Sequence, residues 1–144
     1  MIRRILVALD TSERAPHVLA RAIDLARSTH AAIRIYQGVS LPPSIPPAAH
    51  ARPDPVPQQV LADARKDLLE LAARYSDVEC DVVVDVSYRP PESILRAATA
   101  YDADLIVLGS HGYEVLDRLL GTTAAKVVNT STRDVLVVHG HHAA

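Results

Sequence analysis

Short apolar runs alternate along the chain with longer segments in which apolar residues recur at helical spacing. Arg4 to Leu9 forms a nearly continuous apolar run, which is typical of a parallel strand that is covered on both faces. Ser12, or Thr11, is expected to cap a helix that runs to about Thr29. Ala32–Val39 alternates in polarity and predicts a second strand. The chain therefore begins with a strand–helix–strand unit, whose crossover should be right-handed.

The same two patterns predict the remaining elements. Helices are expected over Gln58–Tyr75, Pro90–Tyr101 and residues 122–131, and strands over Val78–Val86, Asp104–Leu108 and Asp134–Val138. Seven of the ten prolines fall between Ser40 and Pro57, which predicts an extended excursion, either a solvated connector or a lid over a site. Strands that alternate with helices in this way favour an α/β fold, in which an open sheet carries helices on both faces.

Length and composition are typical of one globular domain over residues 1–144, with 49% hydrophobic and 22% charged residues. The formal net charge is −2 and no basic stripe is visible, so nucleic acid is not expected as a partner. The N-terminal apolar run, Ile5–Leu9, is too short for a signal peptide or a membrane span. The single cysteine, Cys80, fits a reducing compartment. We therefore expect a cytoplasmic protein without a membrane partner.

The strongest chemical signal follows the apolar run that ends at Leu108. Gly109 and Gly112 allow the backbone to turn sharply there and to approach a ligand closely. The triplet Gly121–Thr123 then precedes a helix, whose N-terminus offers backbone N–H groups and a positive dipole end to an anion such as phosphate. Asp10 follows the first strand. If the first and fourth strands are neighbours, both loops flank one crevice at the carboxyl edge of the sheet.

Each of these residues also has a structural explanation that involves no ligand. Asp10 ends a strand, where a carboxylate often caps the next helix, and Gly109 and Gly112 could be turn formers. Thr122 and Thr123 could cap their helix, although capping and anion binding use the same N–H groups and are compatible. We favour ligand contacts for the two glycines because they follow the carboxyl end of a strand. For Asp10 both roles stay open.

No constellation of residues indicates an enzyme. There is no Ser/His/Asp or Cys/His spacing for nucleophilic catalysis and no P-loop motif, so at most slow ATP hydrolysis is expected. His111 is a candidate acid or base, but a structural role is the stronger interpretation. His139, His141 and His142 could bind a metal ion, yet nothing in this tail fixes the geometry that a metal requires, so no metal site is predicted.

Four segments together resemble the universal stress protein family. They are Ile5–Ser12 (ILVALDTS), Ala103–Gly112 (ADLIVLGSHG), Gly121–Val128 (GTTAAKVV) and Asp134–Val138 (DVLVV). None of them is specific alone, but the resemblance covers nearly the whole chain. It implies a Rossmann-like α/β fold with an open, five-stranded parallel sheet in the order 3-2-1-4-5. It also implies a homodimer that forms through the last strand, Asp134–Val138, of each subunit.

Many members of this family bind ATP through a glycine motif. In this motif two residues separate the first glycine from the second, and nine residues separate the second from a Gly-Ser or Gly-Thr pair. Gly109, Gly112 and Gly121-Thr122 match it, except that only eight residues separate Gly112 from Gly121. A second departure is Tyr88, where the family usually has glycine, and its bulk could narrow the pocket or alter the turn. The resemblance implies that ATP or another adenine nucleotide, with or without Mg²⁺, binds between the first and fourth strands at Ala8, Asp10, Gly38, Val39, Gly109, Gly112, Gly121, Thr122 and Thr123.

Two functions from different classes are consistent with these patterns. The first is a stress-response regulator that binds an adenine nucleotide, whose phosphates are neutralised by glycine amides and a helix N-terminus. The alternative is a nucleotide-free homodimeric protein that uses the same fold as an interaction scaffold. The glycines and threonine at the matching positions favour the first function. The shortened segment and Tyr88 favour the second.

Overall fold

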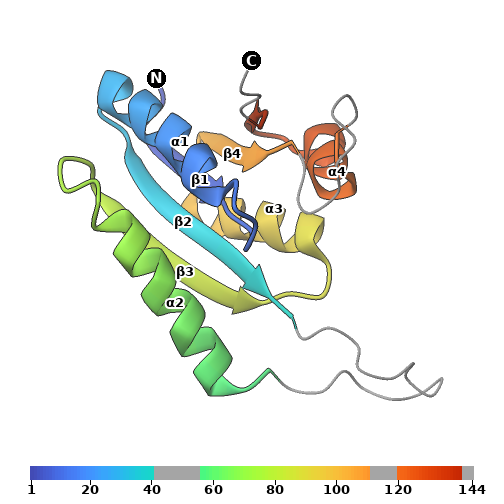
Figure 1. The fold of residues 1–144 in the computed structure, drawn as a ribbon. Coiled ribbons are helices and arrows are strands. Elements are labelled where there is room, and N and C mark those ends of the chain that lie inside the picture. Colours follow the sequence, from blue (N-terminus) through green and yellow to red (C-terminus); the bar gives the residue numbers. More distant parts are fainter. Residues whose placement is uncertain (41–55, 111–119, 141–144) are drawn as a thin grey trace.

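The computed structural model of the chain describes residues 1–40, 56–110 and 120–140. Within these ranges a five-stranded sheet carries helices on both faces (Figure 1). The elements are β1 (Arg4–Ala8), α1 (Ala15–Thr29), β2 (Ala32–Val39), α2 (Gln58–Ala72), β3 (Cys80–Val86), α3 (Pro90–Tyr101), β4 (Leu105–Gly109), α4 (Thr122–Thr130) and β5 (Asp134–Val138). All of the predicted strands and helices are therefore present. No helix in the described ranges is both long enough and apolar enough to cross a membrane.

The strands are hydrogen-bonded in the order β3-β2-β1-β4-β5, and all of them are parallel. This arrangement confirms the predicted order and fold class. β1 is central, because Ala8 pairs with Tyr36 of β2 on one side and with Leu108 of β4 on the other. The chain builds the sheet outward from β1 to β3, and then in the opposite direction from β4 to β5. The carboxyl ends of β1 and β4 thus meet at the switch point where open α/β sheets bind ligands.

Two hydrophobic cores cover the two faces of the sheet. α1 and α2 pack on one face around Ile5 and Val7, and α3 and α4 pack on the other face around Leu6 and Ala8 (Figure 1). The side chains of Ile5, Leu6 and Val7 are fully buried, as expected for a parallel strand between two layers of helices. Tyr36 of β2 belongs to the second core, so its side chain and that of Ala8 face α3 and α4.

α1 begins later than predicted, and neither Ser12 nor Thr11 caps it. Its N-cap is Arg14, which makes no side-chain capping hydrogen bond. The Ser12 hydroxyl donates to Oδ1 of Asp10 at 2.6 Å, and its oxygen accepts a hydrogen bond from the N–H of Arg14 at 3.3 Å. The Ser12 carbonyl oxygen accepts a hydrogen bond from the N–H of Ala15 at 3.2 Å. The segment between β1 and α1 is therefore a turn held by the Asp10 carboxylate, and the helix starts only after this turn.

Two other boundaries lie two or more residues inside the predicted ranges. α2 ends at Ala72 rather than Tyr75, and β3 begins at Cys80 rather than Val78. The N–H of Tyr75 donates to the carbonyl oxygen of Ala72 at 3.0 Å, and the N–H of Val78 donates to that of Tyr75 at 3.3 Å. Because these hydrogen bonds span three residues instead of four, they turn the chain between the helix and the strand.

Candidate functional site

A cavity of about 600 Å³ opens at the carboxyl ends of β1, β2 and β4, beside the first turn of α4. Apolar side chains such as Leu9, Val18, Ile94 and Leu108 form part of its wall. Seven of the nine predicted site residues line it: Ala8, Asp10, Gly38, Gly109, Gly121, Thr122 and Thr123. The fold thus brings residues from three strands and one helix into the crevice that was expected between the first and fourth strands.

The other two predicted residues are not part of the described lining. Gly112 lies outside the described residues. Val39 is the last residue of β2, and its carbonyl oxygen accepts a hydrogen bond from the N–H of Ser87 at 2.9 Å. This bond ties the end of β2 to the segment that follows β3. Ser40 and Ser87, rather than Val39, line the cavity at this end.

Asp10 holds the turn after β1 with one of its two carboxylate oxygens. Oδ1 accepts hydrogen bonds from the N–H of Ser12 at 2.9 Å and from its hydroxyl at 2.6 Å. Oδ2 makes no hydrogen bond within the described part of the chain. Because a carboxylate has several acceptor positions, Asp10 can hold the turn and still accept a hydrogen bond from a ligand in the cavity.

Ser110 joins the ends of β4, β5 and α4. It is 2% exposed. Its N–H donates to the carbonyl oxygen of Val138 at 2.9 Å, and its own carbonyl oxygen accepts a hydrogen bond from the N–H of Gly121 at 2.7 Å. Gly121 has φ −59° and ψ 160°, a conformation open to any residue, so no left-handed turn requires glycine there. Its amide is engaged inside the protein and is not one of the free N–H groups expected from the sequence.

The first turn of α4 offers three other amides to the cavity. Thr122, Thr123 and Ala124 occupy the first three helical positions, whose N–H groups have no partner within a helix. No hydrogen bond to these amides occurs in the part of the chain that the structure describes. The N-cap is Gly121, so the alternative in which the two threonines cap the helix is wrong. These N–H groups at the positive end of the helix dipole are suited to an anion.

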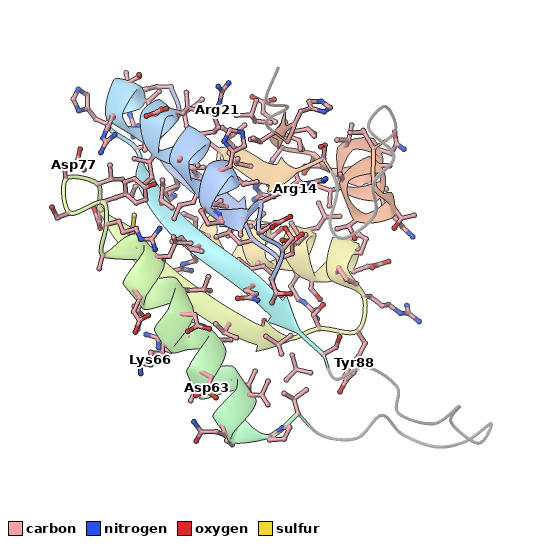
Figure 2. All side chains as sticks on the ribbon, viewed as in Figure 1. Arg14, Arg21, Asp63, Lys66, Asp77 and Tyr88 are labelled. Atoms are coloured by element: carbon pink, nitrogen blue, oxygen red, sulfur yellow. The ribbon has the colours of Figure 1, made fainter. Side chains whose placement is uncertain are left out.

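Arg14 also lines the cavity, although no pattern in the sequence had marked it as a site residue. Figure 2 shows it at the end of α1 that lies toward α4. Its Nε lies 3.4 Å from the position that a Cβ would take at Gly140, just after β5. Within the described ranges its guanidinium forms no ion pair. The available signal was its position as the only basic residue between β1 and α1.

Tyr36 lines the cavity from β2, and it was not predicted either. The residue is 1% exposed. Burial raises the pKa of its hydroxyl, and the negative charge of Asp85 raises this pKa further, whereas Ser93 and Arg96 act in the opposite direction. The hydroxyl forms no hydrogen bond with any described residue. It is thus a protonated, buried polar group at the wall of the cavity.

Gly38 is a glycine because Ser87 approaches it closely. A Cβ at Gly38 would lie 2.7 Å from Cβ of Ser87, a separation that real side chains do not show. Ser87 is itself buried, and its hydroxyl donates to Oγ of Ser93 at 2.7 Å. The register of β2 and β3 explains this contact, since Gly38 pairs with Asp85 and Ser87 follows two residues later. The sequence pattern gave no sign that these serines would meet β2.

Tyr88 does not narrow the cavity, contrary to the expectation from the sequence. The residue is 50% exposed and is not among the lining residues. Figure 2 shows it on the outer side of the connection between β3 and α3. The preceding residue, Ser87, turns inward instead. A bulky side chain at position 88 is therefore compatible with an open cavity.

The chemistry of the site is that of a binding pocket for a polar, anionic molecule. It presents helix amides, a guanidinium, a carboxylate and hydroxyls, which hold such ligands through hydrogen bonds that charge strengthens. In the described ranges, no group of three His, Cys, Asp or Glu side chains is arranged to hold a metal ion. His111, His141 and His142 lie outside the described residues.

Comparisons with known proteins agree with this architecture. The model of the universal stress protein family matches residues 1–139. Universal stress protein A homolog 1 of Coxiella burnetii is 31% identical over 138 residues, which are 94% of this chain and 95% of that protein. A universal stress protein solved in complex with cAMP is 22% identical, with a TM-score of 0.69 and coverage of 96% and 97% of the two chains. One from Archaeoglobus fulgidus in complex with dAMP is 23% identical, with a TM-score of 0.66 and coverage of 95% and 98%.

The two solved structures share the fold of this chain. Their sequence identity to it is too low to show more than the fold. The family model and the Coxiella burnetii protein each match nearly the whole chain, and they confirm the resemblance found in the sequence. The chain belongs to the universal stress protein family.

Proposed function

We propose that this protein is a stress-response regulator that binds an adenine nucleotide, namely ATP, ADP or AMP, in the cavity between β1 and β4. The observation that carries this proposal is the presence of three unpaired amides, those of Thr122–Ala124, in the lining of that cavity. A volume of about 600 Å³ lies within the range typical of cofactor sites. Two proteins of this fold whose structures contain cAMP and dAMP support the same class of ligand.

The distribution of charge in the lining orients the nucleotide. The phosphates lie against the amides of Thr122–Ala124, and Arg14 supplies positive charge from the opposite helix. The base lies between Ala8 and Gly38, at the ends of β1 and β2. There the free oxygen of Asp10 accepts a hydrogen bond from the 6-amino group of adenine. Arg14 and the helix amides thus contact the phosphates of the nucleotide, and Asp10 contacts its base.

The two described ends of the shortened glycine segment line the cavity. The hydrogen bond of 2.7 Å between Ser110 and Gly121 joins the two described ends of the segment. The end of β4 and the start of α4 therefore adjoin each other with eight residues between the glycines, as the cavity requires. This contact keeps Ser110 and Gly121 beside each other at the cavity.

The same proposal includes a homodimer that forms through Asp134–Val138. β5 is an edge strand of the sheet, and edge strands offer unpaired backbone N–H and C=O groups to a partner. Leu136 at its centre is 36% exposed, although the neighbouring position on the same face, Val138, is buried. Pairing with a second copy would cover this apolar side chain.

Calorimetric titration of the purified protein with ATP, ADP and AMP tests the proposed function. We expect a Kd on the order of micromolar for at least one of them, with much weaker binding of UTP as the control for the base. Mass spectrometry of small molecules released by denaturation should identify the same nucleotide. Absence of both released nucleotide and binding heat would overturn the proposal and favour the nucleotide-free homodimeric scaffold.

A further inference from the structure

Tyr36 carries a buried hydroxyl that forms no hydrogen bond within the described part of the chain. The residue is 1% exposed, yet it belongs to the lining of the cavity. A buried polar group without a partner costs free energy, and such groups are rare in native proteins. Phenylalanine would fill the same space without this cost. The hydroxyl at this position therefore points to a partner that enters the cavity.

The neighbouring serines already have partners within the protein. The Ser87 hydroxyl donates to Oγ of Ser93 at 2.7 Å, and Nη2 of Arg96 donates to the same oxygen at 3.3 Å. Ser93 lies near enough to Tyr36 to lower its pKa as a hydrogen-bonding neighbour, but the distance and angle between their hydroxyls fall short of a hydrogen bond in this structure. Since the Ser87 hydrogen is directed to Ser93, the oxygen of Ser87 keeps lone pairs that can accept a further hydrogen bond.

Gly38 places the Tyr36 hydroxyl at the base end of the proposed site. The two residues lie on the same face of β2, two positions apart, and the hydroxyl is 3.6 Å from the position of a Cβ at Gly38. The carboxyl end of β1 adjoins this point, because Ala8 pairs with Tyr36. The amides of Thr122–Ala124 belong to α4, which packs against α3 and β5.

Charges of both signs lie near the hydroxyl. The carboxylate of Asp85 raises the pKa of Tyr36 and the guanidinium of Arg96 lowers it. Burial and Asp85 both raise the pKa of the hydroxyl, which keeps it protonated near neutral pH. A protonated phenol donates a hydrogen bond, and the acceptors that adenine offers are its ring nitrogens.

We propose that the Tyr36 hydroxyl donates a hydrogen bond to a ring nitrogen of the bound nucleobase and so helps to select the base. This inference rests on the proposed nucleotide-binding function. It adds a side chain of β2 to the recognition of the base, on the side of the sheet that α3 and α4 cover. The glycine at position 38 has a second role here, because it leaves the space in which the hydroxyl meets the ligand.

The test is the Tyr36→Phe variant, which keeps the ring and removes only the hydroxyl. Calorimetry with the adenine nucleotide that binds the wild type should show a Kd that is roughly threefold to tenfold higher. The Tm of the free protein should stay the same or rise, because the variant loses an unpaired buried group. Tyr101→Phe is the matched control, since Tyr101 lies on α3 outside the cavity lining, and its Kd should not change.

Nucleotide analogues identify the bond itself. In each analogue one ring nitrogen of adenine, N1, N3 or N7, is replaced by C–H, so that one acceptor is lost. The wild type should bind one of these analogues more weakly than the parent nucleotide. Tyr36→Phe should bind that analogue and the parent with equal affinity, because the same bond is missing in both cases.

The outcomes separate this inference from the function on which it rests. Unchanged nucleotide affinity in Tyr36→Phe, or a lower Tm without a change in affinity, would overturn the inference and assign the hydroxyl a structural role with Ser93. The proposed function would stand in that case. If the wild type binds no adenine nucleotide at all, both the proposed function and this inference are overturned.

Discussion

The N–H of Gly121 donates a hydrogen bond of 2.7 Å to the carbonyl oxygen of Ser110. This bond occupies the amide of the glycine itself and leaves the amides of the following three residues for a ligand. Gly121 also has an extended conformation, which other residues adopt without strain. The anion-binding capacity of the segment therefore depends on the helical amides that start at Thr122, and a substitution there is a sharper test than one at the glycine.

Thr122→Pro should weaken ATP binding by about tenfold to a hundredfold, because it removes one charge-assisted hydrogen bond to a phosphate. The fold should tolerate the change. Thr122 is the first residue of α4, where proline is well accepted, and the preceding Gly121 already has φ −59° and ψ 160°, as a residue before proline requires. Calorimetry with ATP measures the effect, and the Tm verifies that the helix remains.

Thr122→Val is the matched control for the proline variant. It removes the hydroxyl and keeps the amide, so ATP affinity should stay within about threefold of the wild type if the amide carries the interaction. Equal ATP affinity in the proline variant and the wild type would contradict the assignment of phosphate to the N-terminus of α4.

The fold was predictable because its elements have distinct local signals. Continuous aliphatic runs such as Ile5–Leu9 are typical of buried parallel strands, and the helices repeat their apolar positions regularly. The strand order came from the resemblance, and the sheet confirms it. The start of α1 was predicted wrongly because Ser12 belongs to the turn that the Asp10 carboxylate holds, and a sequence pattern does not show that this turn precedes the helix.

The cavity was predictable only where its residues follow strands or precede α4. Gly109 and Gly121 carry such signals, whereas Tyr36 and Ser87 come together through the pairing of β2 with β3. Tyr36 had the pattern of an ordinary core residue, and nothing local shows that its hydroxyl lacks a partner. The sequence also did not show that Ser87, rather than Tyr88, faces the cavity. Side-chain direction at a strand end depends on contacts that are distant in sequence.

Arg14→Gln should raise the Kd for ATP by about threefold to tenfold, because a partly buried cation near the phosphates is lost. AMP carries less charge, so its Kd should rise less. The dependence of ATP affinity on salt concentration should also become weaker, since one fewer positive charge attracts the ligand. Titrations of both nucleotides at low and high salt measure the three effects.

Arg21→Gln is the matched control for Arg14, because Arg21 is an exposed arginine on the same helix and outside the cavity (Figure 2). Its removal changes the net charge equally, so it reports the effect of overall charge on nucleotide binding. If the two variants bind ATP with equal affinity, Arg14 does not contact the phosphates.

Asp104 should make the stability of the protein depend on acidic pH. Its Oδ2 accepts hydrogen bonds from the N–H groups of Arg3 at 2.7 Å and Arg4 at 2.9 Å, and these bonds lower the pKa of its carboxyl below the ordinary 3.8. Because the folded-state pKa is the lower one, the stabilisation is fully present above pH 3.8 and is lost as the pH falls through the folded value. Asp104→Asn should therefore lower stability at pH 7 and flatten the acid side of the profile.

Urea unfolding at a series of pH values measures this effect. Asp67→Asn is the control, because Asp67 is exposed on α2 and makes no hydrogen bond in the described part of the chain. Its pH profile should match that of the wild type. An Asp104→Asn profile parallel to the wild-type one would show that the carboxylate does not hold the start of β1.

Leu136→Glu should convert the proposed homodimer into a monomer. Leu136 lies in the edge strand β5 and is 36% exposed in the single chain, so a charge there costs the monomer little. In a dimer that pairs through β5 the same charge would be buried beside its symmetry mate, which is strongly unfavourable. Size-exclusion chromatography with light scattering should show half the mass of the wild type, with a Tm close to that of a monomeric fold.

Thr132→Glu is the matched control for the dimer variant, because it adds the same charge at an exposed residue just before β5. Its mass should equal that of the wild type, since it leaves the paired strand unchanged. A dimeric Leu136→Glu variant would place the interface on another surface, and a monomeric wild type would remove the dimer from the proposal. In the second case nucleotide binding would have to be explained within one chain.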